Sequence, residues 1–264
     1  MLDAQLYRLT DRTLIEVSGS DAFKFLQNLI TNDLNDFHPN LMYSALLTPQ
    51  GKYLFDFFII KKSNTIFFID ISSQAKEEFL SRLKMYKLRS DVNVEEVQGH
   101  VGVGFSNKPS GAFFDPRCKQ LGWRQYFFES TAPTNIPILG RKYYDKLRVD
   151  HCIPETGIEL IKDKTFILEV GFDRLSGVSF TKGCYVGQEV TARMKHKTEL
   201  QKGLGKVKVL GKIGESTNKI LSQGKVVGTL FTRVEDYAIA YLKFKYEDSL
   251  LKVGNAQVVL VERY

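Results

Sequence analysis

Two apolar runs separated by a short turn sequence constrain the fold of this chain more than any other feature. Residues 43–47 (Tyr-Ser-Ala-Leu-Leu) and 53–60 (Tyr-Leu-Phe-Asp-Phe-Phe-Ile-Ile) flank Pro49-Gln50-Gly51. Apolar runs joined through a Gly-containing turn indicate a β-hairpin. A carboxylate, Asp56, lies inside the second run, where burying it is costly unless it has a partner. Asp56 is therefore a candidate site residue; an edge strand with Asp56 pointing at water is the alternative.

The segments around this hairpin predict an α+β unit of ferredoxin-like type. Residues 14–18, 65–71 and 92–97 have the composition of strands. A helix from Ser20 or Asp21 to about Ile30 shows an apolar stripe, with either polar residue able to cap it. A second helix starts at Ser73 and has one apolar face, formed by Ala75, Phe79, Leu80 and Leu83.

The last third of the chain has a different sequence pattern. Residues 106–138 are expected to form strands joined by irregular loops, and a helix follows over about 140–149. Short strands separated by glycines come after this helix. They are expected at 204–210, 225–231, 237–244 and 257–261. This spacing predicts a small all-β barrel or sandwich as a separate C-terminal domain.

Composition limits the classes of partner and compartment. The chain has 264 residues and a formal net charge of +7, which fits an anionic partner, but its basic residues form no long run. Three widely spaced cysteines argue against a disulfide framework and for a reducing compartment. The N-terminus lacks the blocks of a signal peptide, and no apolar run is long enough to span a membrane. We expect a cytoplasmic monomer without stable nucleic-acid binding, membrane association or a structural metal.

A Gly-containing motif near the middle of the chain concentrates reactive groups. Residues 182–189 read Lys-Gly-Cys-Tyr-Val-Gly-Gln-Glu and continue to Arg193. Glycine tolerates backbone angles and close approaches that a side chain would block, so a shaped loop is expected here. A thiol next to Lys182 could have a lowered pKa and be reactive. The alternative is an ordinary turn with Cys184 buried as a small hydrophobe.

This motif resembles the signature of the YgfZ family, folate-binding relatives of the glycine-cleavage T-protein (aminomethyltransferase). Further segments of the first half are similar to that family, at residues 9–12, 17–22, 25–33 and 46–52. The resemblance implies a three-module cloverleaf like that of the T-protein, with a ferredoxin-like module and a C-terminal β-barrel. It implies a discontinuous folate-binding module at 1–40 plus 105–198, the ferredoxin-like module at 41–104, and the barrel at 199–264.

The resemblance also implies folate-binding residues outside the motif. In the T-protein a carboxylate after a Gly-containing turn faces the folate, and Asp56 follows Gly51 at a similar spacing. The T-protein segment R-L-E, whose Glu contacts the pterin ring, corresponds to Arg148 and the residues after it. Asp150 stands where that Glu would be and is one methylene shorter. Arg148 is therefore either a site residue or a structural ion-pair partner.

Within the motif the resemblance implies that Cys184 is an essential thiol. It also implies that Lys182, Gln188, Glu189 and Arg193 are folate-binding residues. Cys184 could attack a carbon unit, bind a transient cluster or receive an oxidative adduct. Lys182 could tune the thiol or be solvated. Glu189 and Arg193 are four residues apart and could pair across one helical turn.

Two functions follow from the resemblance. The first is a protein that binds tetrahydrofolate or another reduced folate and supports assembly or repair of iron–sulfur enzymes, including enzymes that modify tRNA. Its partners would be those enzymes or cluster-assembly proteins. The alternative is a tetrahydrofolate-dependent aminomethyl or methyl transferase of the T-protein type. Cys184, which the T-protein lacks, favours the first function, and Asp56 suits both. A third possibility, RNA binding, has only the net charge in its favour.

Overall fold

The computed structural model describes residues 6–37, 41–128, 135–196, 199–214 and 217–264. The chain forms two compact units, and both are discontinuous in sequence. The first consists of Met1–Leu139 with Leu175–Gln188, and the second of Gly140–Arg174 with Glu189–Tyr264. Each unit is described separately below.

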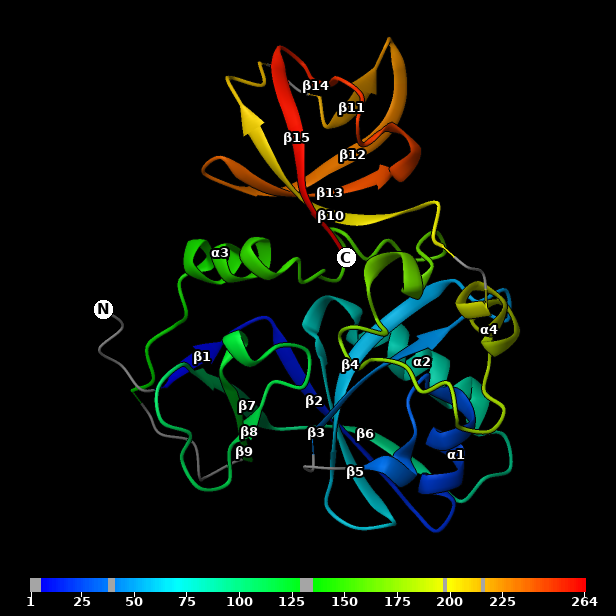
Figure 1. The fold of residues 1–264 in the computed structure, drawn as a ribbon. Coiled ribbons are helices and arrows are strands. Elements are labelled where there is room, and N and C mark those ends of the chain that lie inside the picture. Colours follow the sequence, from blue (N-terminus) through cyan, green and yellow to red (C-terminus); the bar gives the residue numbers. More distant parts are fainter. Residues whose placement is uncertain (1–5, 38–40, 129–134, 197–198, 215–216) are drawn as a thin grey trace. The chain divides into compact units, whose positions relative to one another are not determined.

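A five-stranded antiparallel sheet is the centre of the first unit (Figure 1). The predicted hairpin around the Pro49-Gln50-Gly51 turn is present, with Tyr43 opposite Phe58. The strand order is β3-β4-β5-β2-β6. The strands are β2 (Arg12–Ser18), β3 (Leu41–Leu47), β4 (Tyr53–Lys61), β5 (Ile66–Ser72) and β6 (Asn93–Val97).

The two faces of this sheet have different chemistry because successive strand residues point to opposite sides. Phe55, Phe57 and Ile59 belong to the apolar core shared with helices α1 (Ala22–Leu29) and α2 (Lys76–Lys87). The intervening residues, including Asp56, lie on the other face and are buried as well. The strand β4 is therefore buried on both faces, and the edge-strand alternative for Asp56 is wrong.

A four-stranded sheet covers part of the second face. Its order is β1-β7-β9-β8, with β1 (Tyr7–Leu9), β7 (Gly99–Gly104), β8 (Phe113–Phe114) and β9 (Trp123–Phe128). Side chains join the sheets: Arg124 lies 3.9 Å from the ring centre of Phe58, and the ring centres of Phe68 and Phe128 are 4.4 Å apart. The strands β8 and β9 lie in the region 106–138, where strands joined by irregular loops were predicted.

The predicted module boundary at residues 40 and 41 does not match this sheet. The strand β2, which the resemblance assigns to the discontinuous module, pairs with β5 on one side and β6 on the other. Helix α1 follows β2 and packs into the same core. The hydrogen-bonded sheet thus includes residues from Arg12 onwards. No local pattern in the sequence encodes this pairing.

The second unit contains the predicted barrel, closed by six antiparallel strands (Figure 1). The order β10-β13-β12-β11-β14-β15 includes two short strands that the sequence analysis missed, β11 and β14. Helix α3 (Arg141–His151) precedes the barrel in sequence, and α4 (Gln188–His196) starts where the first unit ends. The barrel strands are β10 (Lys202–Leu210), β11 (Lys219–Ser222), β12 (Lys225–Val234), β13 (Tyr237–Lys243), β14 (Leu251–Val253) and β15 (Ala256–Arg263). The predicted α+β class with a C-terminal barrel is confirmed.

Candidate functional site

The motif segment, residues 181–188, is attached to the first unit at the end of helix α1. The Lys182 ammonium donates hydrogen bonds to the carbonyls of Gln27, Ile30 and Asn32 at 2.7, 2.8 and 2.9 Å. The last carbonyls of a helix have no partner within it, and a cation near them is favourable. Lys182 therefore serves as a C-terminal cap of α1, a role that differs from both expected alternatives.

Burial lowers the pKa of Lys182 to about 8, an effect that nearby Asp33 opposes. The ordinary value is 10.5. Between these values the unfolded chain binds more protons at Lys182 than the folded chain does, so the free energy of unfolding should rise with pH. Relative to a Lys182→Met variant, the increase should approach about 1.4 kcal/mol per pH unit. Urea titrations of both proteins from about pH 7 to about pH 9.5 measure this difference, and a constant difference would contradict the prediction.

The second glycine of the motif packs against the β3–β4 turn. Gly187 has a φ of +86°, and a Cβ there would lie 2.5 Å from the Thr48 carbonyl oxygen and 3.1 Å from the Gly51 Cα. Backbone atoms cannot move aside as a flexible side chain can. The motif segment is thus held at both ends, by Lys182 on α1 and by Gly187 on the hairpin.

Alanine should destabilise the protein at Gly187 and have little effect on stability at Gly183. Gly187→Ala should lower the free energy of unfolding by more than about 1 kcal/mol, because it combines an unfavourable φ with a backbone clash. Gly183→Ala is the matched control, since a Cβ there meets no atom within 4 Å. It should change stability by less than about 0.5 kcal/mol. Chemical denaturation of both variants tests the pair, and equal losses would contradict this account of the packing.

Cys184 lies between these two attachments and is exposed. The following residues face inward: Tyr185 is 8% exposed, and Val186 packs against the core of the first unit. The Val186 amide also donates to the Asn28 carbonyl at 3.3 Å. The alternative of a buried, inert cysteine is therefore wrong for Cys184. The description of a buried, inert cysteine applies instead to Cys152, whose complete burial raises its pKa to about 12.

Asp56 is buried with two tyrosine hydroxyls as partners. Tyr53 donates to Oδ1 at 2.7 Å and Tyr43 donates to Oδ2 at 3.0 Å. Burial, with the nearby Asp56 carboxylate, raises the pKa of Tyr43 well above its ordinary value, so this hydroxyl stays a donor. The two bonds offset part of the cost of burying the carboxylate and fix its orientation.

A chain of buried ions lies on the same face of the sheet as Asp56, and sequence analysis did not find it. Asp70, which is fully buried, pairs with Arg124 at 2.8 Å and with Arg12 at 2.6 Å. Arg124 continues to Asp115 at 3.2 Å, and Asp115 pairs with Arg117 at 2.8 Å. Although burial opposes it, Arg117 holds the pKa of Asp115 below its ordinary value. The sequence did contain one indication of this ion chain. Residues 66–72 form an apolar strand, and Asp70 lies among its buried positions.

Arg148 and Asp150 belong to the second unit and have charged partners there. Arg148 is completely buried and pairs with Glu159, and it pairs with Glu155 at 2.7 Å. Asp150 accepts hydrogen bonds from Lys146 at 2.9 Å and Lys206 at 3.2 Å. Although partial burial alone would raise it, these bonds hold the pKa of Asp150 below its ordinary value. This arrangement matches the structural ion-pair interpretation of Arg148.

The remaining motif residues lie at the start of helix α4. The Gln188 side-chain oxygen accepts the Tyr185 amide at 3.2 Å, which closes the motif segment. Glu189 and Arg193 are exposed, and within the described residues no ion pair joins them. The predicted site residues thus divide between the units, with Asp56, Lys182, Cys184 and Gln188 in the first and Arg148, Asp150, Glu189 and Arg193 in the second.

In the part of the chain that the structure describes, no group of three or more His, Cys, Asp or Glu side chains is arranged to hold a metal ion. Over the same residues, no helix has both the length and the hydropathy needed to cross a bilayer.

Known families match both ends of the chain. Residues 3–103 match the GCVT N-terminal domain, and residues 201–262 match the CAF17 C-terminal beta-barrel domain. Among solved structures, the glycine cleavage system aminomethyltransferase T from Bartonella henselae aligns with a TM-score of 0.72. The alignment covers 98% of this chain and 87% of that chain at 12% identity, which shows the fold alone. The predicted T-protein-like fold is confirmed.

Three relatives are named as the iron–sulfur cluster assembly factor IBA57 or its homolog. The iron–sulfur cluster assembly factor IBA57 homolog of Neurospora crassa is 32% identical over 76% of this chain and 53% of its own length. The IBA57 of Mus musculus is 30% identical over 80% of this chain and 68% of its own length. That of Homo sapiens is 29% identical, covering 84% and 72%. The chain thus spans about half the length of the fungal relative and more of the mammalian ones, and it belongs to the family of the iron–sulfur cluster assembly factor IBA57.

Proposed function

We propose that this chain binds tetrahydrofolate or another reduced folate and supports the assembly or repair of iron–sulfur enzymes through the Cys184 thiol. The relatives are named as iron–sulfur cluster assembly factors, which supports the assembly part of this role. Its partners would be iron–sulfur enzymes, tRNA-modifying ones included, or cluster-assembly proteins. The cluster is the cargo of this function and not a resident cofactor.

The exposure of Cys184 on an anchored segment carries the proposal. A reactive thiol needs access to a partner, whereas a buried thiol is inert. Lys182 and Gly187 attach the segment to the first unit on either side of Cys184 and so hold the thiol at the surface. Cys152, fully buried, has no such access. The two fixed ends make the position of the thiol reproducible, as docking to a protein partner requires.

Asp56 is the residue that we propose contacts the reduced folate. A carboxylate can accept two parallel N–H bonds from the aminopyrimidinone edge of a pterin ring. Asp56 has its orientation fixed by Tyr43 and Tyr53, so little ordering is needed when a ligand binds. Tetrahydrofolate, when bound, supplies or accepts a one-carbon unit. Asp56 would hold its ring, and the charge of +7 suits a polyglutamate tail.

A tetrahydrofolate-dependent aminomethyl or methyl transferase is the second candidate. The oriented, buried carboxylate of Asp56 favours it, because such a group is what the T-protein resemblance implies for transfer. The two candidates differ at Cys184. A transferase of the T-protein type should retain its activity in a Cys184→Ala variant and lose it in Asp56→Asn, whereas the assembly role needs the thiol.

Titration with reduced folates, read by thermal shift, tests folate binding. A ligand at about 100 times its dissociation constant should stabilise the protein by about 2.7 kcal/mol. The Asp56→Asn variant should lose most of this shift, and Cys184→Ala should keep it. If no folate form shifts the melting temperature of the wild type, the folate part of the proposal is wrong.

Location and oligomeric state are further predictions of this proposal. A cytoplasmic monomer is still our expectation, and the names of the relatives place those proteins in mitochondria. Fractionation of cells and sedimentation of the purified chain measure both properties.

A further inference from the structure

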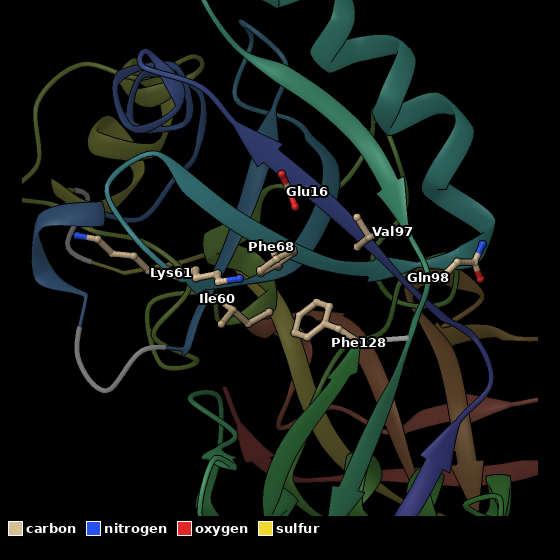
Figure 2. A pocket seen from close by; sticks show the side chains of 8 residues that line it. Glu16, Ile60, Lys61, Phe68, Val97, Gln98 and Phe128 are labelled. Atoms are coloured by element: carbon tan, nitrogen blue, oxygen red, sulfur yellow. The ribbon is translucent and has the colours of Figure 1, made fainter. Parts of the chain in front are cut away.

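A pocket of about 600 Å³ opens in the first unit, on the face of the five-stranded sheet that carries Asp56 and Asp70 (Figure 2). Ile60, Phe68 and Glu16 form a row across β4, β5 and β2, because Phe68 is directly opposite Ile60 on one side and Glu16 on the other. Phe128, the last residue of β9, closes one side. Neither Asp56 nor Cys184 lines this pocket.

The wall formed by the two phenylalanines is suited to a flat ring. Phe68 and Phe128 have ring centres 4.4 Å apart with their planes tilted by 42°. Phe68 is 7% exposed and held by the sheet, while Phe128 is half-buried. Because the two rings contact each other, a ligand would lie against their exposed surface and not between them. Such aromatic contacts add stabilisation beyond the area that they bury.

Glu16, the carboxylate in this row, has no hydrogen-bond or ion-pair partner among the described residues, although it is half-buried. The register places Glu95 directly opposite Glu16 on the same face of the sheet. Like charges directly opposite each other destabilise a sheet. A ligand with N–H donors would satisfy Glu16 and relieve this repulsion.

A lysine gives one side of the pocket the opposite charge. Lys61 and Lys62 follow Ile60, and both line the pocket. The Lys62 ammonium lies 5.9 Å from the centre of the Phe68 ring, so it is close to the aromatic wall, and the residue is exposed. The Lys61 ammonium instead lies 5.7 Å from the ring of Phe23, which packs against the core on the other face of the sheet. An anionic substituent on a ring bound at Phe68 would be within the range of the Lys62 ammonium.

We propose that this pocket binds a flat, amino-substituted heteroaromatic ring that carries an anionic group. The ring lies on Phe68 and Phe128, its amino edge donates to Glu16, and its anion faces Lys62. Pterin carboxylates and purine nucleotides share this chemistry. The site is separate from the Asp56 and Cys184 sites, so it does not depend on the function proposed above.

Calorimetric titration of the full chain with two probes tests the proposal. Pterin-6-carboxylate and guanosine monophosphate represent the two sources, and pterin and guanosine are their uncharged counterparts. At least one anionic probe should bind about tenfold more tightly than its counterpart, since hydrogen bonds to charged groups contribute about 1.5–3 kcal/mol. Whichever pair shows the difference identifies the source.

Variants of the pocket residues test whether the anionic probe binds in this pocket. Glu16→Gln and Lys62→Glu should each weaken the anionic probe by about tenfold or more. Lys84→Glu is the matched control, because Lys84 is an exposed lysine of α2 that does not line the pocket, and it should leave affinity unchanged. Melting curves confirm that each variant is folded. The proposal is overturned if neither anionic probe binds, or if binding survives both pocket variants and is lost only in Asp56→Asn.

Discussion

A Cys184→Ala variant should fail to support iron–sulfur enzyme activity in cells while keeping the fold and the folate binding of the wild type. The side chain is exposed, so removing its sulfur leaves no cavity and no unpaired group in the core. The contacts that hold the segment come from Lys182, Val186 and Gly187 and do not involve the thiol. The functional loss should therefore occur without a loss of stability.

The measurement is complementation. Cells lacking this protein receive the wild type, Cys184→Ala or Cys118→Ala, and the activity of an iron–sulfur enzyme is assayed at equal protein levels. Cys118 is the matched control, because it is a partly exposed thiol of the same unit outside the motif segment. Full complementation by Cys184→Ala would show that the thiol has no special role. Loss in both variants would indicate a general need for thiols and would also contradict the proposal.

Local patterns were sufficient for the central hairpin and for four of the six barrel strands. The hairpin followed from two apolar runs and a Gly-containing turn, and the barrel from short strands at regular spacing. These signals are encoded within a few residues. The position of β2 between β5 and β6 could not be predicted in this way, because pairing between distant strands depends on the whole sheet.

The candidate site was predictable to a similar extent. The burial of Asp56 followed from its apolar neighbours, but its tyrosine partners depend on the register of β3 against β4. Asp70 and Arg124 are 54 positions apart, and Lys182 reaches a carbonyl 155 positions away. No spacing rule covers such distances. For this reason the sequence motif located Cys184 correctly at an irregular segment but gave the wrong surroundings for Lys182.

The Arg148→Met variant should lose about 3–5 kcal/mol of unfolding free energy, because it leaves a buried carboxylate without its cation. Glu159 is 2% exposed and pairs with the Arg148 guanidinium. The same guanidinium donates to the Ile153 carbonyl at 3.1 Å and to the Thr232 hydroxyl at 3.2 Å. It thus joins helix α3 to the segment after it and to strand β12, all within the second unit.

Urea titration followed by circular dichroism measures this loss, with Lys146→Ala as the control on the same helix. Lys146 pairs with Asp150, but its side chain is 54% exposed, so its removal should cost no more than about 1 kcal/mol. Adding Glu159→Gln to Arg148→Met should restore part of the stability, because the unpaired charge is then removed. The other interpretation of Arg148, as a folate contact, makes the opposite prediction: weaker folate binding at unchanged stability. The buried ion pairs of Arg148 favour the structural role, since a guanidinium already paired with Glu159 could turn to a ligand only by leaving this buried carboxylate without its cation.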